Sequence, residues 1–391
     1  MQAETTDLSD QIARLSVELR ASGAAAILLS SPADVCYATG FEVPPAIDAG
    51  AEFAGGPALA LVTAAGHSHL LFPNAYTARA ERMSRAAETT PLPTFGHFYA
   101  VDAGAEFLEA LARALAGAGL GDGTLALDRR TLPASVAELL RTRFSATPLV
   151  DGTGISAAAR RIKTPRELEL VRRAVAAVDA GQEALLELAR PGANELELWA
   201  AVVGRIEASA GHETPVVGEL VSGPRTSVVS YPGGPVDRTL ERGDTVLMDI
   251  SARVDGYWAD CCNTLVAGAA PDDEQLLHYR AAHDAFDAAV AELRPGRRAC
   301  DAYAAAEAAF VRHGLRSTHY AGHQVGASVN EGPRLVPYDT TPIEAGMVFA
   351  VEPGTYAGEG GRTGARTEKV VLVTTDGPEV LSSFRFGMDL H

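Results

Sequence analysis

The sequence predicts an α+β protein of two domains: a smaller α/β domain over residues 1–155 and a larger α+β domain over residues 156–391. Three observations lead to this expectation. The chain has 391 residues, enough for two domains with cores of their own. Short apolar runs alternate with helical patterns over the first third. After residue 155, long helical patterns accompany strands that include a hairpin, which indicates an antiparallel sheet.

The first domain is expected to alternate helices and strands. Residues 8–22 place Ile12, Leu15 and Leu19 at helical spacing, and Gly23 follows as a stop signal. The apolar residues 24–29 then predict a buried strand. The same reasoning predicts later strands over residues 58–62, 70–72, 124–128 and 147–151, and helices over residues 107–115 and 135–144.

The second domain is expected to begin with a long helix. Thr164 suits the N-cap position and Pro165 the first helical position, so this helix should start there. Further helices are predicted over residues 195–209, 272–293 and 299–313, and strands over residues 221–231, 244–254, 346–351 and 369–374.

Composition and charge narrow the class of partner. Asp and Glu number 50 against 33 Lys and Arg, a formal net charge of −17, which disfavours non-specific binding to nucleic acid or to an anionic membrane. The acidic start of the chain lacks the basic head and apolar run of a secretory signal. Four cysteines without a CxxC pattern suit a reducing compartment. We therefore expect a cytoplasmic protein whose partners are a small molecule or short peptide and a second copy of the chain.

One stretch of the second domain carries the first chemical signal. Residues 245–260 predict a strand, a turn at Asp255 and Gly256, and a second strand, with an acidic residue on each arm of the hairpin. Asp249 lies in an otherwise apolar strand, where an unpaired carboxylate is costly to bury. We expect Asp260, on the other arm, to meet it. A multivalent metal ion is the usual way to keep two facing carboxylates ionised.

Three residues downstream complete a candidate set of metal ligands. His323 lies between glycines, Glu352 ends an apolar strand before a Pro-Gly turn, and Glu368 begins another buried strand. Four carboxylates and one imidazole suit two hard or borderline divalent ions, such as Mn, Co, Fe or Zn. Taken singly, Asp260 also fits a solvated strand residue, Glu352 a strand end, and His323 an ordinary hydrogen-bonded histidine. The metal prediction therefore depends on all five residues occurring together.

The five residues and their surroundings resemble the metal-ligand motifs of the pita-bread family, which includes methionine aminopeptidase, Xaa-Pro aminopeptidase, prolidase and creatinase. The matching segments are Met-Asp-Ile and Gly-Tyr-Trp-Ala-Asp in the hairpin, then Ala-Gly-His-Gln-Val-Gly, Val-Glu-Pro-Gly and Arg-Thr-Glu. Residues 37–41 resemble the N-terminal domain of the creatinase and prolidase branch, and residues 161–168 its linker helix. The resemblance implies a pita-bread catalytic domain after a creatinase-like N-terminal domain, a homodimer and a dinuclear metal centre.

The resemblance also implies a role for each ligand. Asp249 would bind one metal through both oxygens, and Asp260 and Glu368 would bridge the two metals. His323 and Glu352 would complete the other metal, and Glu352 is also the family's candidate proton shuttle.

Two positions depart from the pattern of the family's peptidases. A histidine usually precedes a tyrosine after the Ser-Gly strand, and here Ser230 precedes Tyr231. A second histidine usually follows the ligand histidine by seven residues, and here that residue is Asn330, followed by Glu331. In the peptidases these histidines contact the substrate amide and the developing tetrahedral centre. Ser230 and Asn330 can donate hydrogen bonds but cannot carry a proton near pH 7, so acid–base catalysis would fall to Glu352 or Glu331.

Four residues are expected to bind substrate or to support the ligands. Arg225 is either a clamp for a substrate carboxylate or part of a surface turn, and His319, four residues before the ligand histidine, either lines the cleft or packs structurally. Tyr231 is expected beside the substrate. Arg366 would hold neighbouring carboxylates ionised through charge-assisted hydrogen bonds.

Three functions are compatible with these patterns. We favour a dinuclear-metal hydrolase of the Xaa-Pro peptidase and prolidase type, in which a metal-bridged hydroxide cleaves a C–N bond of a short peptide or small amide. The alternative is a non-peptidase amidohydrolase or lyase acting on a small metabolite, because Ser230 and Asn330 replace the usual histidines. The third, a catalytically silent binding module, is disfavoured because a binder has no need of several buried acids.

Overall fold

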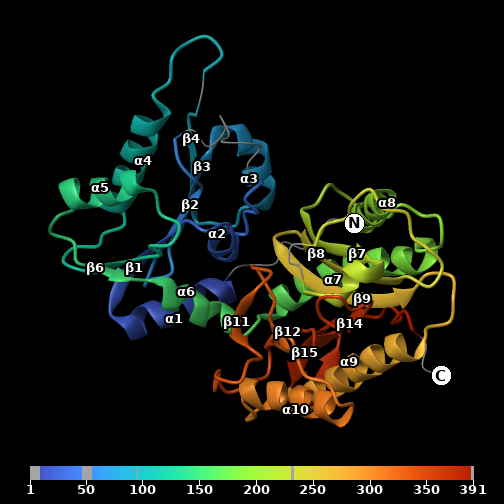
Figure 1. Ribbon diagram of the computed structural model, residues 1–391. Helices are drawn as coiled ribbons and strands as arrows, with labels where there is room; N and C mark the ends of the chain where they lie inside the picture. Colours follow the sequence, from blue (N-terminus) through green and yellow to red (C-terminus); the bar gives the residue numbers. More distant parts are fainter. Residues whose placement is uncertain (1–8, 46–54, 95, 230–232, 389–391) are drawn as a thin grey trace. The chain divides into compact units, whose positions relative to one another are not determined.

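The structure is a computed structural model that describes residues 9–45, 55–94, 96–229 and 233–388 (Figure 1). The chain separates into two compact units, Met1–Arg160 and Arg161–His391. The boundary expected between residues 155 and 156 lies inside helix α6 (Thr153–Arg161). The expected α+β architecture is confirmed by the strands and helices of both units.

Unit 1 is built on a six-stranded mixed sheet with the strand order β4-β3-β2-β1-β5-β6. Strand β1 (Ala24–Leu29) pairs antiparallel with β2 (Leu59–Thr63) and parallel with β5 (Thr124–Leu127). Strand β3 (Ser68–Pro73) runs antiparallel to β2, and β4 (Glu88–Leu92) and β6 (Leu149–Asp151) form parallel edges.

Helices cover both faces of this sheet because the side chains of β1 alternate between two apolar cores. Ile27 and Leu29 pack into a core with α1 (Ser9–Ser22), α2 (Pro32–Thr39), α3 (Thr77–Met83) and α6. Ala26 and Leu28 pack into a second core with α4 (Ala103–Gly117) and α5 (Ala134–Arg143). This alternation is the period of two that a strand imposes on its side chains.

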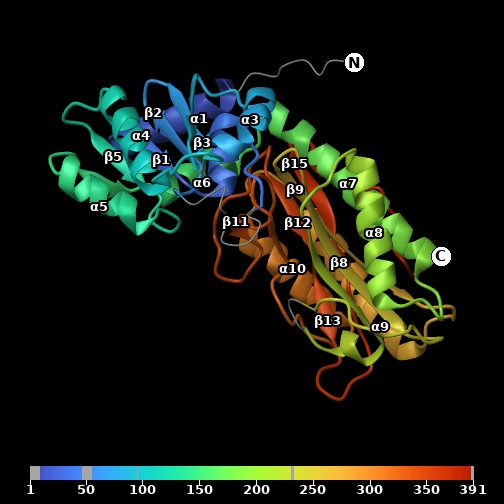
Figure 2. The same ribbon diagram turned by 90° about the horizontal axis from the view of Figure 1, so that it is seen from above.

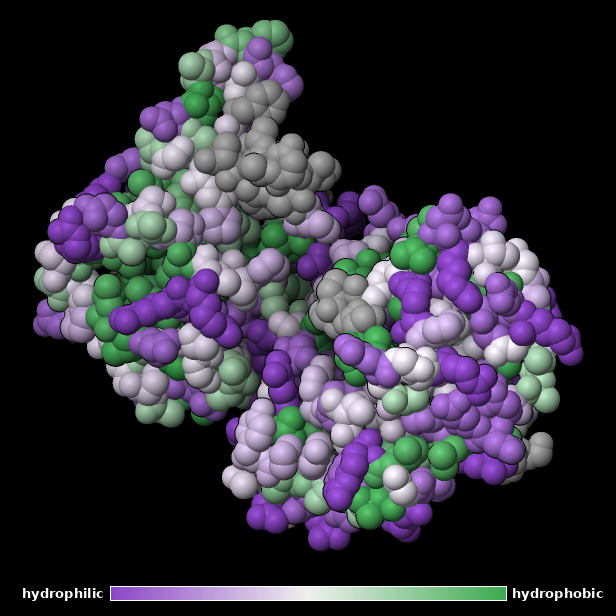
Figure 3. Space-filling view, in the orientation of Figure 1, coloured by the Kyte–Doolittle hydropathy of each residue, from purple (hydrophilic) through white to green (hydrophobic). Residues whose placement is uncertain are grey.

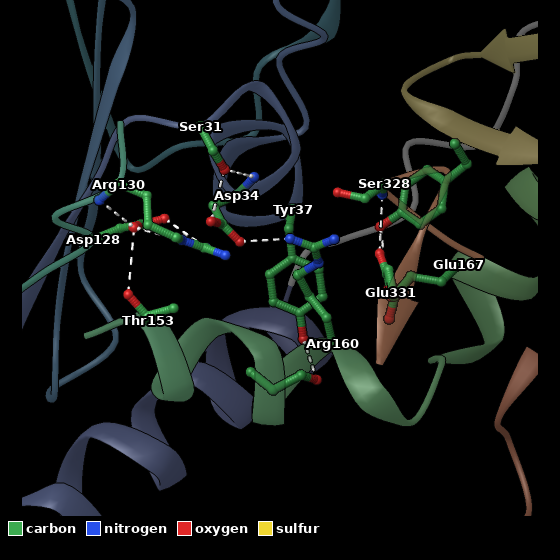
Figure 4. Close-up of polar contacts among 12 residues, drawn as sticks. Ser31, Asp34, Tyr37, Asp128, Arg130, Thr153, Arg160, Glu167, Ser328 and Glu331 are labelled. Atoms are coloured by element: carbon green, nitrogen blue, oxygen red, sulfur yellow. Dashed lines mark hydrogen bonds and ion pairs between the residues drawn. The ribbon is translucent and has the colours of Figure 1, made fainter. Parts of the chain in front are cut away.

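Ion pairs and a tyrosine join the helices and strand ends of unit 1 (Figure 4). Arg160 Nη1 on α6 lies 2.7 Å from Asp34 Oδ1 on α2, and both side chains are buried. Tyr37 donates a hydrogen bond of 2.9 Å from its hydroxyl to the Ala159 carbonyl. After β5, Arg130 pairs with the buried Asp128 at 2.9 Å. Helix α6 is therefore tied to α2 by polar as well as apolar contacts.

Unit 2 has two halves, each made of a helix pair and antiparallel strands. In the first, α7 (Pro165–Leu188) and α8 (Glu195–Ala210) accompany the sheet of β7 (Val216–Ser222), β8 (Thr245–Val254) and β9 (Tyr257–Val266). Figure 2 shows these two helices running side by side along one side of the unit. The predicted start of α7 is confirmed, since Thr164 and Glu167 form a capping box.

The second half contains α9 (Asp273–Glu292) and α10 (Ala299–Arg312), whose apolar faces form a core with a five-stranded sheet. Its strand order is β11-β10-β12-β15-β16, and β13 and β14 form a separate pair. The strands are β10 (Gly322–Gln324), β11 (Glu331–Arg334), β12 (Val348–Val351), β13 (Gly354–Tyr356), β14 (Gly364–Arg366), β15 (Lys369–Thr374) and β16 (Gly377–Val380).

The strand predicted over residues 221–231 was wrong. Strand β7 ends at Ser222, and the short 3₁₀ helix η3 (Gly223–Ser227) follows it. The chain leaves the sheet there because Gly223 adopts a φ of +58° and Pro224 has no backbone N–H to donate to a ladder.

The surface of unit 2 is largely hydrophilic on the face seen in Figure 3, where the apolar patches are small and separated. Large apolar side chains of this unit, such as Phe310, Phe349 and Val371, lie in its core instead. Within the described parts of the chain, every helix is too short or too polar to cross a membrane.

Candidate metal centre

The hairpin of β8 and β9 carries two of the five predicted ligands. It turns at Asp255 and Gly256, whose φ angles of 49° and 86° lie in the left-handed region. The register pairs Asp249 with Cys262 and Asp260 with Ser251, so the two aspartates lie diagonally, two positions apart. Because side chains alternate along a strand, both project from the same face of the sheet. Their carboxyl groups are close enough to share a hydrogen bond.

The other half of unit 2 brings His323 and Glu352 to the same place. His323 lies in β10, and Glu352 follows the neighbouring strand β12. The Nε2 atom of His323 is 3.3 Å from Glu352 Oε1 and 3.7 Å from Asp260 Oδ2. Its Nδ1 atom is 2.9 Å from the Gln324 carbonyl oxygen, which can only accept, so Nδ1 carries a proton. In the neutral imidazole, the lone pair of Nε2 then faces the carboxylates, as it does in histidines that bind metal.

Glu368 is the candidate ligand whose negative charge is least compensated. The residue is 0 % exposed, and among the described residues neither of its carboxylate oxygens has a hydrogen-bond partner. Ligand atoms of Asp260, His323 and Glu368 all lie within 4.8 Å of one another. A buried carboxylate without a donor is strongly disfavoured unless a cation neutralises it. The residues therefore fit a divalent metal ion.

The pKa values of the ligands follow from their burial. Burial raises the pKa of Asp249 and of Glu368 well above its ordinary value, and repulsion from the neighbouring carboxylates adds to this. Burial also raises the pKa of Asp260. Burial opposes a charge on His323, but its hydrogen bond to Glu352 outweighs this, so the pKa of His323 is raised. A bound cation would favour the ionised carboxylates and the neutral imidazole.

One guanidinium lies beside the ligands. Arg366 Nη2 is 2.7 Å from Glu219 Oε2 and 2.8 Å from Asp249 Oδ2. The backbone of Arg366 is itself fixed, because its carbonyl accepts a hydrogen bond of 2.8 Å from the Thr264 hydroxyl. Arg366 thus supports Asp249, whereas its contact with substrate stays a prediction.

Sequence reasoning missed Glu219. This residue lies in β7 directly opposite Asp249 and is 5 % exposed. Its Oε2 atom pairs with Arg366, and its Oε1 atom is buried without a partner. An acidic residue in a short, mostly apolar strand was the available signal, the same one that singled out Asp249.

The structure places Glu331 and Asn330 in contacts of their own. The Glu331 carboxylate lies 3.1 Å from the ammonium nitrogen of Lys163 and accepts a hydrogen bond of 2.9 Å from the Ser328 backbone, toward which it turns in Figure 4. The Asn330 side-chain oxygen accepts a hydrogen bond of 3.0 Å from Arg334 Nε. Acid–base catalysis by Glu331 and a substrate contact by Asn330 remain predictions.

The other predicted substrate residues differ in their surroundings. His319 has Nδ1 2.8 Å from the Tyr320 carbonyl oxygen, while its Nε2 atom is buried without a partner. Burial lowers the pKa of His319, so its imidazole is neutral at pH 7. Arg225 pairs with the buried Glu195 and donates to the Gly234 carbonyl at 2.7 Å. Ser230 and Tyr231 lie outside the described residues.

Comparison with known proteins identifies two domain families in the chain. Residues 169–375 match the model of metallopeptidase family M24, and residues 11–162 match the creatinase/prolidase N-terminal domain. A protein named Xaa-Pro dipeptidase, from Pyrococcus furiosus, is 32 % identical over 225 residues, which cover 57 % of this chain and 63 % of the relative. The alignment thus spans less than two thirds of that relative's own length.

Solved structures resemble the chain over almost its whole length. The prolidase from Pyrococcus horikoshii OT3 has a TM-score of 0.78 at 23 % identity and covers 97 % of this chain and 100 % of its own. Dipeptidase PepE from Mycobacterium ulcerans has a TM-score of 0.78 at 25 % identity and covers 99 % of both chains. With the family model matched across the strands that carry the five acidic and histidine residues, this chain belongs to metallopeptidase family M24, the pita-bread family of the Xaa-Pro peptidases and prolidases.

Proposed function

We propose that this protein is a metal-dependent hydrolase that cleaves a C–N bond of short Xaa-Pro peptides. The observation that carries the proposal is the fully buried Glu368, whose two unpartnered oxygens lie beside Asp260 and His323. The similarity to a relative named Xaa-Pro dipeptidase supports the substrate class.

The proposed cofactor is a pair of divalent ions, drawn from Mn, Co, Fe and Zn. The oxygen-rich set that would hold them is Asp249, Asp260, His323, Glu352 and Glu368. Bound there, the ions would supply a hydroxide nucleophile at neutral pH and would polarise the carbonyl of the scissile bond. Neighbouring side chains orient two of these carboxylates. Arg366 pairs with Asp249, and Ser251 donates a hydrogen bond of 2.7 Å to Asp260.

Glu352 is the proposed proton shuttle to the leaving nitrogen. Its side chain is 7 % exposed, and its Oε1 atom lies 3.3 Å from His323 Nε2. Without a metal ion, burial opposes the charge of Glu352, but a hydrogen bond from protonated His323 outweighs this and lowers the pKa of Glu352. With metal ions bound, their positive charge would take over this role and favour the ionised carboxylate, which can take up a proton during the reaction and pass it on.

Metal analysis coupled to an activity assay tests the proposal. We expect about two divalent ions per purified chain. Chelation should abolish turnover of Xaa-Pro dipeptides and tripeptides, and adding back Mn, Co, Fe or Zn should restore it. Glu368→Gln should lose both metal and activity, whereas Glu359→Gln, at an exposed loop residue, should lose neither. Full activity in metal-free protein would disprove the proposed mechanism.

A second candidate is an amidohydrolase or lyase that acts on a small metabolite at the same site. The observation that favours it is Asn330, which stands where the family's peptidases usually carry a histidine and whose amide oxygen is already bound to Arg334. A protein that holds two metal ions yet cleaves no Xaa-Pro peptide would point to this function. Failure of Ser230→His and Asn330→His to create peptidase activity would support it further.

We also propose that the protein is a homodimer, as the family resemblance implies. Sedimentation equilibrium of the purified chain tests this directly. A monomer at micromolar concentration would contradict it.

A further inference from the structure

The sheet face that carries Asp249 holds one carboxylate more than its guanidinium can neutralise. Glu219 and Asp249 are direct partners in the ladder between β7 and β8. One nitrogen of Arg366, Nη2, contacts both, at 2.7 Å from Glu219 and 2.8 Å from Asp249. One positive charge is therefore shared between two negative charges. If a metal ion engages Asp249, Arg366 is left to pair with Glu219 through Oε2 alone.

The second carboxylate oxygen of Glu219, Oε1, accepts no hydrogen bond from any of the described residues. Oε1 is buried and lacks a hydrogen-bond partner, although the residue as a whole is only 5 % exposed. A carboxylate oxygen can only accept hydrogen bonds, and burying an ionised one without a donor is costly. Glu219 Oε1 is therefore free to accept a hydrogen bond from a cation that the described residues do not supply.

The backbone holds Glu219 in this place. At the preceding residue, Gly218, a Cβ atom would lie only 2.1 Å from the Asp249 carbonyl oxygen, and the φ angle of Gly218 is +152°. Strand β7 therefore approaches β8 more closely than any side chain at that position would allow. This close approach keeps the backbone of Glu219 paired with that of Asp249.

Other unpartnered polar atoms lie within the electrostatic reach of Glu219. The His319 Nε2 atom and the Tyr356 hydroxyl are both buried without partners. A Cβ atom built on Gly354 would lie 2.6 Å from the first and 3.1 Å from the second, so both groups lie beside Gly354. The negative charge of Glu219 makes a small contribution that raises the pKa of both His319 and Tyr356.

We propose that Glu219 is a specificity-determining residue whose Oε1 atom binds an ammonium group of the substrate, so that the enzyme selects substrates with a free, positively charged amine. This inference rests on the proposed hydrolase function. Arg366 occupies Oε2 and leaves Oε1 to the substrate. Selectivity would then come from charge pairing at Glu219 as well as from the metal ligands.

Steady-state kinetics of the metal-loaded protein test the proposal with two probes. Ala-Pro carries the amine, and propionyl-Pro has the same shape without it. For Glu219→Gln we expect KM for Ala-Pro to rise by about 10- to 100-fold, the loss of one charge-assisted hydrogen bond. We expect KM for propionyl-Pro to change much less than KM for Ala-Pro, because propionyl-Pro has no amine to lose. Glu213→Gln, an exposed residue just before β7, is the matched control and should change none of these quantities.

Calorimetric binding of Ala-Pro separates the two possible failures. If the wild type cleaves Ala-Pro and Glu219→Gln changes KM for both probes equally, or loses metal without losing preference for the amine, then Glu219 only supports Arg366 and the inference is wrong. If the wild type binds Ala-Pro in a Glu219-dependent manner but does not cleave it, the proposed function fails and the inference stands. If it neither binds nor cleaves, both fail.

A second variant covers the case in which Glu219→Gln does not fold. Glu219→Asp keeps the negative charge but withdraws it by one methylene from the substrate side. It should also raise KM for Ala-Pro without altering KM for propionyl-Pro. An unchanged KM for Ala-Pro in Glu219→Asp would argue against the inference.

Discussion

Removing the ammonium group of Lys163 should destabilise unit 2 strongly. The side chain of Lys163 is 0 % exposed and that of its partner Glu331 is 7 % exposed, with 3.1 Å between Nζ and Oε2. Lys163 also donates a hydrogen bond of 2.8 Å to Gln324 Oε1. Lys163→Met keeps most of the aliphatic stem but leaves the Glu331 carboxylate buried without this cation.

The size of the effect follows from that burial. Removing one partner of a buried ion pair costs about 3–5 kcal/mol of unfolding free energy. The Ser328 backbone N–H still donates to Glu331 at 2.9 Å, so we expect a value near the lower end of this range. For a unit of this size each kcal/mol lowers the melting temperature by about 2–4 °C, so a cost near 3 kcal/mol should lower the melting temperature of unit 2 by roughly 6–12 °C.

Urea unfolding followed by tryptophan fluorescence measures this directly, because both tryptophans, Trp199 and Trp258, lie in unit 2. Lys163→Met combined with Glu331→Gln should be more stable than Lys163→Met alone, since no buried charge is left. The control is Arg205→Met, which breaks an exposed pair with Glu187 and should cost less than about 1 kcal/mol. A cost for Lys163→Met as small as that of the control, or a double variant no more stable than Lys163→Met alone, would refute the reasoning.

Three further predictions concern the metal centre and the pH response. Ser251→Ala removes the hydrogen bond to Asp260 and should weaken metal binding by about 10- to 100-fold, measured by competition with a chelator. Gly354→Ala places a Cβ atom 2.6 Å from His319 Nε2 and should reduce turnover by about 10- to 100-fold, whereas Gly234→Ala, with open space around it, should not. Burial raises the pKa of Asp179, so its carboxyl stabilises the fold below its unfolded pKa and loses this contribution as pH rises through the folded value. Asp179→Asn should therefore gain stability relative to the wild type as pH rises above about 4, the unfolded pKa of an aspartate, and urea unfolding that shows no such trend would contradict the assignment.

The local elements of this protein could be predicted because their signals are local. The Thr164-Pro165 pair marks the start of a helix wherever it occurs in such a context, and the structure has the helix beginning there. Asp255 and Gly256 tolerate the positive φ angles of a tight hairpin turn, and β8 and β9 do join through them. The error in residues 221–231 arose where apolar composition favoured a strand but Gly223 and Pro224 ended it.

The candidate ligands could be singled out from the sequence because acidic residues in apolar strands are costly to bury without a partner. Residue types and motifs were enough to predict Asp249, Asp260, His323, Glu352 and Glu368 as a set. The sequence did not reveal which polar groups would lie beside them. Glu219 and Asp249 are 30 residues apart in the sequence and become neighbours only through the pairing of β7 with β8. Glu331 and Lys163, which form an ion pair, are 168 residues apart.

The sequence by itself therefore determined the long helices and the hairpin, because capping and turn geometry act over a few residues, and it predicted the ligand set from the cost of burying charge. The tertiary structure alone decided which charges became neighbours. It paired Glu331 with Lys163, and it gave Arg366 two carboxylates to neutralise instead of one. Strand register and long-range packing set these pairings, and neither is encoded in any short stretch of the chain.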